Sequence, residues 1–117
     1  MNLSLGQTNM TLTELIHYFR SGGKYECFCQ EQTLDPESEV VEIYASAPLS
    51  LESNLAFFEI EKTGGCIEHS HDNIKYRNLF DFYFFQGAIE ESISEQNQNL
   101  EDSEIASKLL SYAINDA

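Results

Sequence analysis

The stretch GGCIEHSHDN at residues 64–73 holds the side chains of this sequence that are best suited to metal or acid–base chemistry. Cys66, His69 and His71 are all metal-ligand types, and Asp72 adds a carboxylate directly after them. Either histidine could also serve as a general base that Asp72 or Glu68 orients. These residues define one functional hypothesis, a small metal-assisted or acid–base enzyme.

The spacing of these ligands argues against a metal site. On a strand, His69 and His71 share one face while Cys66 points away from both. On a helix, Cys66 neighbours His69, but His71 lies roughly 160° around the axis from His69. Since a zinc site usually needs four ligands, we expect no bound metal or cofactor. The plainer interpretation is a polar turn in which Asp72 caps a following helix.

Acidic charge is the strongest feature of the composition. Twenty acidic residues stand against six basic ones, which gives a formal net charge of −14. Nine carboxylates and no base lie between Lys24 and Lys62, and a second run without bases extends from Glu90 to Glu104. Such a field repels nucleic acid and anionic membranes and accelerates encounter with basic proteins. The alternative interpretation is that the acidity only keeps the protein soluble.

The acidic runs predict a binding module that engages a basic surface on another protein and inhibits or regulates that protein. A basic toxin would fit this hypothesis. So would a nucleic-acid-binding protein, because carboxylates can occupy the sites at which it normally binds phosphates. Tyrosine among carboxylates suits an interface, because it combines apolar area with a polar tip. The predicted partner-binding residues are Asp35, Glu37, Glu39, Glu42, Tyr44, Glu90, Glu91 and Glu95.

The length of 117 residues predicts one domain, 1–117, in which residues 1–9 form a loose leader. No apolar run approaches the roughly 18 residues of a membrane helix, and the N-terminus lacks the pattern of a signal peptide. Three cysteines form an odd set, and Cys27 and Cys29 would share one face of a strand. We therefore expect a cytoplasmic protein with unpaired thiols.

The first half of the chain predicts one helix followed by strands. Thr11 and Glu14 form a capping-box pattern, and the glycines at 22–23 end the helix. Residues 25–30 and 40–47 are expected to be strands. For residues 50–62 two interpretations stay open: a strand at 57–61 followed by a hairpin turn at 63–65, which we favour, or a helix that ends at Gly64.

The second half predicts two helices. Residues from Asn73 onward repeat apolar side chains at helical spacing, which favours one long helix. The alternative is that LFDFYFF at 79–85 is a central strand followed by a short helix from Ala88. Asn99 is expected to cap the final helix, whose apolar stripe is Ile105, Leu109 and Tyr112.

Taken in order, these elements predict an α+β fold. It has an N-terminal helix, an antiparallel sheet of three or four strands, and two C-terminal helices packed on the sheet. The aromatic residues Phe80, Phe82, Phe84 and Phe85 exceed the needs of one helix face. We expect them to be buried in the core or to form a homo-oligomer contact.

Overall fold

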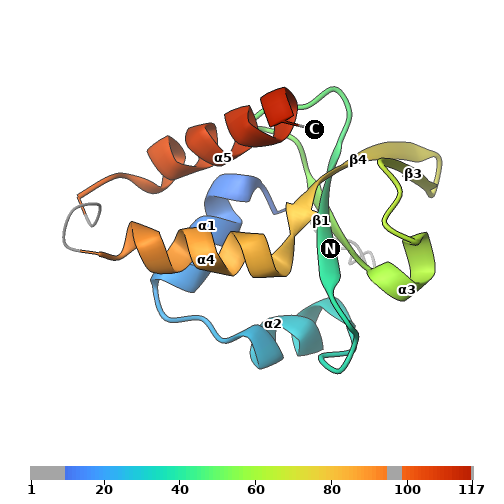
Figure 1. Ribbon diagram of the computed structural model, residues 1–117, viewed down its shortest axis with the longest axis horizontal. Helices are drawn as coiled ribbons and strands as arrows, with labels where there is room; N and C mark the ends of the chain where they lie inside the picture. Colours follow the sequence, from blue (N-terminus) through green and yellow to red (C-terminus); the bar gives the residue numbers. More distant parts are fainter. Residues whose placement is uncertain (1–9, 95–98, 117) are drawn as a thin grey trace, which may run out of the picture.

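A computed structural model describes residues 10–94 and 99–116, which form an α+β fold around one curled antiparallel sheet of four strands (Figure 1). The strand order is β2-β1-β4-β3, so β2 and β3 are the two edges. The elements in chain order are α1 (Leu12–Arg20), α2 (Tyr25–Gln32), β1 (Val41–Ser46), β2 (Leu55–Glu59), α3 (Ile60–Thr63), β3 (Glu68–His71), β4 (Ile74–Asp81), α4 (Phe82–Ser92) and α5 (Asp102–Asp116). Within the described ranges, no helix is both long and apolar enough to cross a membrane. The leader predicted for residues 1–9 lies outside the described residues.

The predicted start of α1 is confirmed in detail. The Thr11 side chain accepts a hydrogen bond from the Glu14 amide, and the Glu14 carboxylate accepts one from the Thr11 amide. This reciprocal pair satisfies two amides that the first helical turn leaves without partners. Leu12, Leu15 and Ile16 are buried on the face that α1 turns to the core.

Residues 25–32 form the helix α2, so the predicted strand at 25–30 is wrong. Tyr25, Phe28 and Cys29 have the i, i+3, i+4 spacing of one helix face, and Phe28 and Cys29 are fully buried. The ring of Phe28 packs 4.9 Å from that of Phe57 (centroid to centroid). Because residues two apart on a helix face different sides, Cys27 is exposed while Cys29 is buried.

The favoured strand at 57–61 is confirmed as β2, although it spans residues 55–59. Its continuation combines both interpretations, because Ile60–Thr63 form the short helix α3, which ends at Gly64 in the left-handed conformation with φ +67°. The predicted hairpin turn at 63–65 is wrong, since β2 and β3 lie at opposite edges of the sheet. Both elements pair instead with the strands between them.

The segment after Asp72 is a strand, and the predicted helix start at Asn73 is wrong. Asp72 and Asn73 have φ of +53° and +66°, as the two central residues of a tight type I′ hairpin turn require. They join β3 to β4, and His71 at the end of β3 pairs with Ile74 at the start of β4. Asp81 is the N-cap that begins α4, because its carboxylate accepts a 2.8 Å hydrogen bond from the Phe84 amide.

Helix α5 begins at Asp102, three residues after the predicted cap Asn99. A carboxylate attaches it to α1: Asp102 accepts a 3.0 Å hydrogen bond from Arg20 and lies 2.9 Å from the His17 ring nitrogen Nδ1. Arg20 also donates to the carbonyl oxygens of Leu100 and Ser92. One guanidinium therefore joins the end of α4 and the start of α5 to α1.

The predicted apolar stripe of α5 is confirmed for Ile105 and Leu109, which are buried, whereas Tyr112 is 44% exposed. Its ring stacks on that of Phe84, with centroids 4.6 Å apart. Of the other aromatic residues of the 80–85 segment, Phe80, Phe82 and Phe85 are buried. Most of the aromatic surplus is therefore core.

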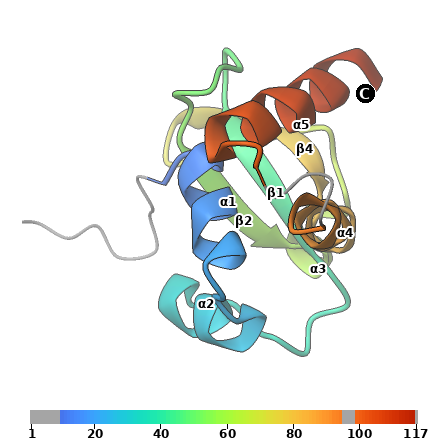
Figure 2. The ribbon, with the colours of Figure 1, turned by 90° about the vertical axis from the view of Figure 1, so that its left-hand side faces the viewer.

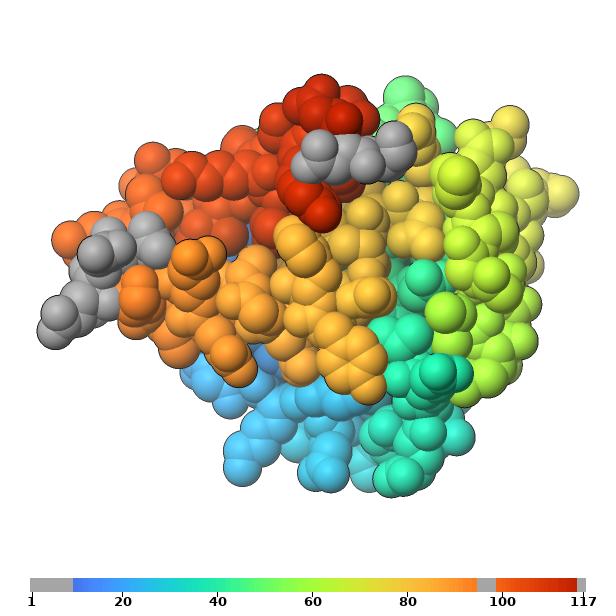
Figure 3. Space-filling model, in the orientation of Figure 1, coloured from blue at the N-terminus to red at the C-terminus, as the bar shows by residue number. Residues whose placement is uncertain are grey.

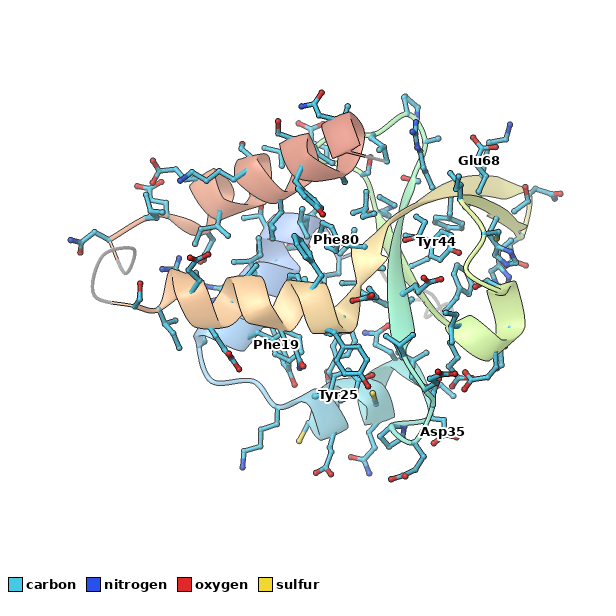
Figure 4. All side chains as sticks on the ribbon, viewed as in Figure 1. Phe19, Tyr25, Asp35, Tyr44, Glu68 and Phe80 are labelled. Atoms are coloured by element: carbon cyan, nitrogen blue, oxygen red, sulfur yellow. The ribbon has the colours of Figure 1, made fainter. Side chains whose placement is uncertain are left out.

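The sheet separates two sets of buried side chains. Val41, Ile43 and Ala45 of β1 point to the main core, which α1, α2, α4 and α5 cover (Figure 2). Tyr44 points to the opposite face, toward β3, while Phe80 lies on the helix side (Figure 4). A register shift between Ile43 and Tyr44 accommodates an extra residue in β4, and such bulges bend a strand and increase its twist. The sheet curls around Tyr44.

Candidate functional site

The loop of residues 35–39 between α2 and β1, here called the acidic loop, holds three acidic residues in five positions; Figure 4 labels Asp35 at its start. Its side chains Asp35, Glu37 and Glu39 are exposed. Two carboxylates, one at the end of β2 and one in α3, hold its backbone. Glu59 accepts a 2.7 Å hydrogen bond from the Asp35 amide, and Glu61 accepts a 2.9 Å bond from the Glu39 amide. Five carboxylates therefore gather around one fixed loop.

The hydrogen bonds of this arrangement change the pKa of Glu61. The Ser38 hydroxyl donates a 2.6 Å hydrogen bond to the Glu61 carboxylate, and the Glu39 amide donates to its second oxygen. These two bonds, in that order of importance, lower the pKa of Glu61 below its ordinary value. The negative charge of Glu61 is thus stabilised by the loop that it holds. Lys62, whose Nζ lies 3.4 Å from Glu59, offsets part of the local charge.

Two predicted partner-binding residues do not belong to this surface. Tyr44 is fully buried, so the expectation that it stands on the solvent side of its strand is wrong. Its hydroxyl donates a 2.7 Å hydrogen bond to the Cys66 carbonyl, and burial raises the pKa of Tyr44 to about 12. Glu42 is half-buried on the same face of β1, where it accepts a hydrogen bond from the Thr63 hydroxyl. Tyr76 of β4 is also buried.

The remaining predicted acids lie elsewhere. Glu90 and Glu91 are exposed near the C-terminal end of α4, and Glu95 lies outside the described residues. In Figure 1 this end of α4 and the acidic loop lie toward different ends of the longest axis. Figure 3 shows α4 on the front surface between α5 and the residues of α2. The two acidic runs of the sequence therefore form separate surfaces rather than one face.

His69 and His71 lie on one face of β3, as alternation along a strand requires, with ring centroids 6.4 Å apart. The curl of the sheet brings them to the opposite edge: the Phe58 ring of β2 lies 4.7 Å from His69 and 5.5 Å from His71. A cavity of about 340 Å³ lies beside these rings and also contacts Phe57, Glu59, Lys62 and residues 32–34. The histidines therefore line a groove between the two edge strands.

Cys66 has a different environment from the histidines. Its carbonyl oxygen accepts hydrogen bonds from Tyr44 and from the Asn78 side chain, and its sulfur lies 3.7 Å from the Tyr44 hydroxyl. Across the part of the chain that the structure describes, no three His, Cys, Asp or Glu side chains are grouped so that they could hold a metal ion. Asp72, expected to be a helix cap, instead lies 3.5 Å from the His71 ring in the turn.

Sequence reasoning missed three residues of these surfaces: Glu59, Glu61 and Phe58. The alternation of residues 57–61 puts Glu59 and Glu61 on one side of a strand, but it does not say which loop their carboxylates meet. Both contacts join residues more than twenty positions apart. Only the pairing of β2 with β1 brings them together.

No family model matches this chain, and the comparisons with curated proteins and with solved structures found no match either.

Proposed function

We propose that this chain is a small acidic binding module that engages a basic surface on another protein and thereby inhibits or regulates that protein. The observation that supports the proposal best is the acidic loop, in which Asp35, Glu37 and Glu39 are exposed on a backbone that Glu59 and Glu61 hold in place. Because a fixed loop loses little conformational freedom on binding, its carboxylates can contact Arg and Lys side chains at low entropic cost.

The chemistry of the partner follows from the charge. Spaced carboxylates on a rigid surface attract guanidinium and ammonium groups, and the net charge of −14 accelerates encounter with a basic protein. A nucleic-acid-binding protein or a basic toxin would present such groups in an array. We propose a cytoplasmic location, which the odd number of cysteines favours.

A binding experiment with paired variants tests the proposal. The probe is a labelled peptide rich in arginine and lysine, titrated with the protein at low and at physiological salt. Glu37→Gln with Glu39→Gln removes two charges from the acidic loop, and Glu90→Gln with Glu91→Gln removes two from α4. Exposed ion pairs contribute a few tenths to about 1 kcal/mol each, so the loop variant should bind roughly fivefold more weakly. Affinity that ignores salt, or equal losses in both variants, would exclude the acidic loop as the binding surface.

A further inference from the structure

The groove beside His69 and His71 runs along the outer edge of β2, the edge that faces away from β1. Phe57 and Phe58 are neighbours in an extended strand, so their side chains face opposite sides of the sheet. Phe57 belongs to the main core, while Phe58 contacts β3. Both nevertheless line the same cavity of about 340 Å³. A cavity that both faces share must lie at the edge between them.

The pairing of β2 shows which backbone groups this edge presents. The Ser46 amide donates to Asn54 and the Ile60 amide to Val40, which identifies the hydrogen-bonded pairs of the β1–β2 ladder. By alternation, Glu42 and Phe58 form another such pair, whereas Phe57 lies opposite Ile43 in a pair that is not hydrogen-bonded. The amide and carbonyl of Phe57 therefore point away from β1.

The same alternation directs the amide of Leu55 and that of Glu59 outward. Leu55 uses its amide already, in a 2.9 Å hydrogen bond to the Met10 carbonyl. For Phe57 and Glu59, no such backbone partner occurs among residues 10–94 and 99–116. An edge with unpaired amides and carbonyls is a template for another strand. The β2 edge at Phe57 and Glu59 borders the groove described above.

The walls and the end of the groove indicate which strand would fit. Leu34 lines one side and the two histidines line the other, so alternate side chains of an added strand would meet different walls. Glu59 lies at the end of β2, where its carboxylate accepts a hydrogen bond from the Asp35 amide. This end of the groove is therefore next to the acidic loop. Leu34, Phe57 and Phe58 give the groove apolar surface among polar lining residues that include Lys62. This apolar surface beside the carboxylates favours a strand in which apolar residues alternate with basic ones.

We propose that the β2 edge binds an extended basic segment of the partner protein as a fifth strand. The backbone of this segment pairs with Phe57 and Glu59, its apolar side chains enter the groove, and its Arg or Lys side chains reach Glu59 and the acidic loop. Adding a strand in this way is a common mode of peptide recognition. This inference rests on the proposed function and names the form in which the basic partner is recognised.

Backbone methylation of a peptide tests the inference without changing any charge. The probe is the acetylated and amidated peptide Arg-Val-Arg-Val-Arg-Val, compared with one analogue N-methylated at its valines and one N-methylated at its arginines. A strand pairs with its neighbour through alternate residues. One analogue should therefore bind about tenfold more weakly than the parent peptide, since it loses net hydrogen bonds, and the other should bind within about threefold. Amide resonances of Phe57 and Glu59 should shift in the parent complex.

The control on the protein side compares Glu59→Gln with Glu52→Gln. The first keeps an acceptor for the Asp35 amide and removes a charge at the groove, whereas Glu52 is exposed in the loop before β2. We expect weaker binding in the Glu59 variant alone. If both methylated analogues bind as well as the parent, the added strand is wrong while the acidic binding function stands. If none of the three peptides binds at low salt, the proposed function itself fails. If light scattering shows a dimer, and the amide resonances of Phe57 and Glu59 shift as the dimer forms, a second copy of the chain occupies the edge and the basic occupant is wrong.

Discussion

The imidazole of His69 lies 4.7 Å from the ring of Phe58, a contact between the two edge strands of a four-stranded sheet. Two strands, β1 and β4, separate these edges in the sheet. The contact therefore requires the sheet to curl until β2 and β3 face one another. Tyr44 fills the inside of this curl, with its ring 5.3 Å from Phe58 and its hydroxyl bonded to Cys66.

Phe58→Ala should loosen the β3–β4 hairpin. The substitution removes the ring that His69, His71 and Tyr44 contact, and we expect a loss of about 2 kcal/mol in the free energy of unfolding. Hydrogen exchange should show weaker protection of residues 68–71. Phe84→Ala is the matched control, because Phe84 contacts Phe80 and Tyr112 rather than β3. Equal protection of residues 68–71 in both variants would contradict a closing contact at Phe58.

Arg20→Met should destabilise the helical layer. The Arg20 side chain is 13% exposed and donates to Asp102, Leu100 and Ser92. Its removal takes this donor from two carbonyl oxygens and leaves the Asp102 carboxylate with its contact to His17. We expect a loss of about 2–3 kcal/mol, measured by urea unfolding. Lys24→Met removes the same charge from an exposed position, and its effect should stay within about 0.5 kcal/mol. Similar losses in both variants would show that charge, not these hydrogen bonds, carries the effect.

Asn73→Gly should stabilise the protein, by roughly 0.5 kcal/mol in thermal unfolding. Asn73 has φ +66° in the second central position of the hairpin turn, where glycine is favoured. In the helix first expected from Asn73, glycine would instead be destabilising. Asp81→Ala is the complementary change: it removes the cap of α4 and should cost about 1 kcal/mol. A destabilised Asn73→Gly variant would contradict the turn.

Stability should fall as the pH rises from about 10 to about 12. Burial raises the pKa of Tyr44 to about 12 and also raises the pKa values of Tyr25 and Tyr76. An unfolded tyrosine ionises near pH 10, so the unfolded state releases protons first and its free energy falls relative to that of the folded state. Below pH 10 this contribution is fully present.

Urea unfolding at several alkaline pH values measures this loss. Tyr44→Phe should flatten the dependence between pH 10 and pH 12, whereas Tyr83→Phe, at an exposed position, should keep the slope of the parent protein. An unchanged slope in the Tyr44 variant would contradict its burial as a cause.

Local patterns in the sequence predicted the elements whose signals lie within a few residues. The capping box of Thr11 and Glu14 needs only four positions, and β1 carries the β-branched and aromatic residues that favour strands. The overall α+β class and the acidic character of the loop at 35–39 followed in the same way. These features depend on composition and on spacings of a few residues, which are the same whatever tertiary contacts the chain makes.

Tertiary structure decided the elements whose apolar residues fit two periods. Residues 74–81 form a strand because β1 and β3 pair with them on both sides, and the bulge near Leu79 offsets their alternation. Residues 25–32 form a helix because Phe28 packs among Phe19, Phe57 and Phe82. Such contacts join distant parts of the chain, so no local window contains them.

The acidic surface likewise depends on both levels: the sequence sets its charge, and long-range contacts set which residues form it. The sequence alone determined that this chain is acidic and that nine carboxylates and no base lie between Lys24 and Lys62. Only the pairing of β1 with β2 brought Glu59 and Glu61 to the acidic loop, and only the curl of the sheet buried Tyr44 and opened a groove at the β2 edge. Residue types fix charge and local preference, whereas long-range strand pairing fixes which side chains share a surface.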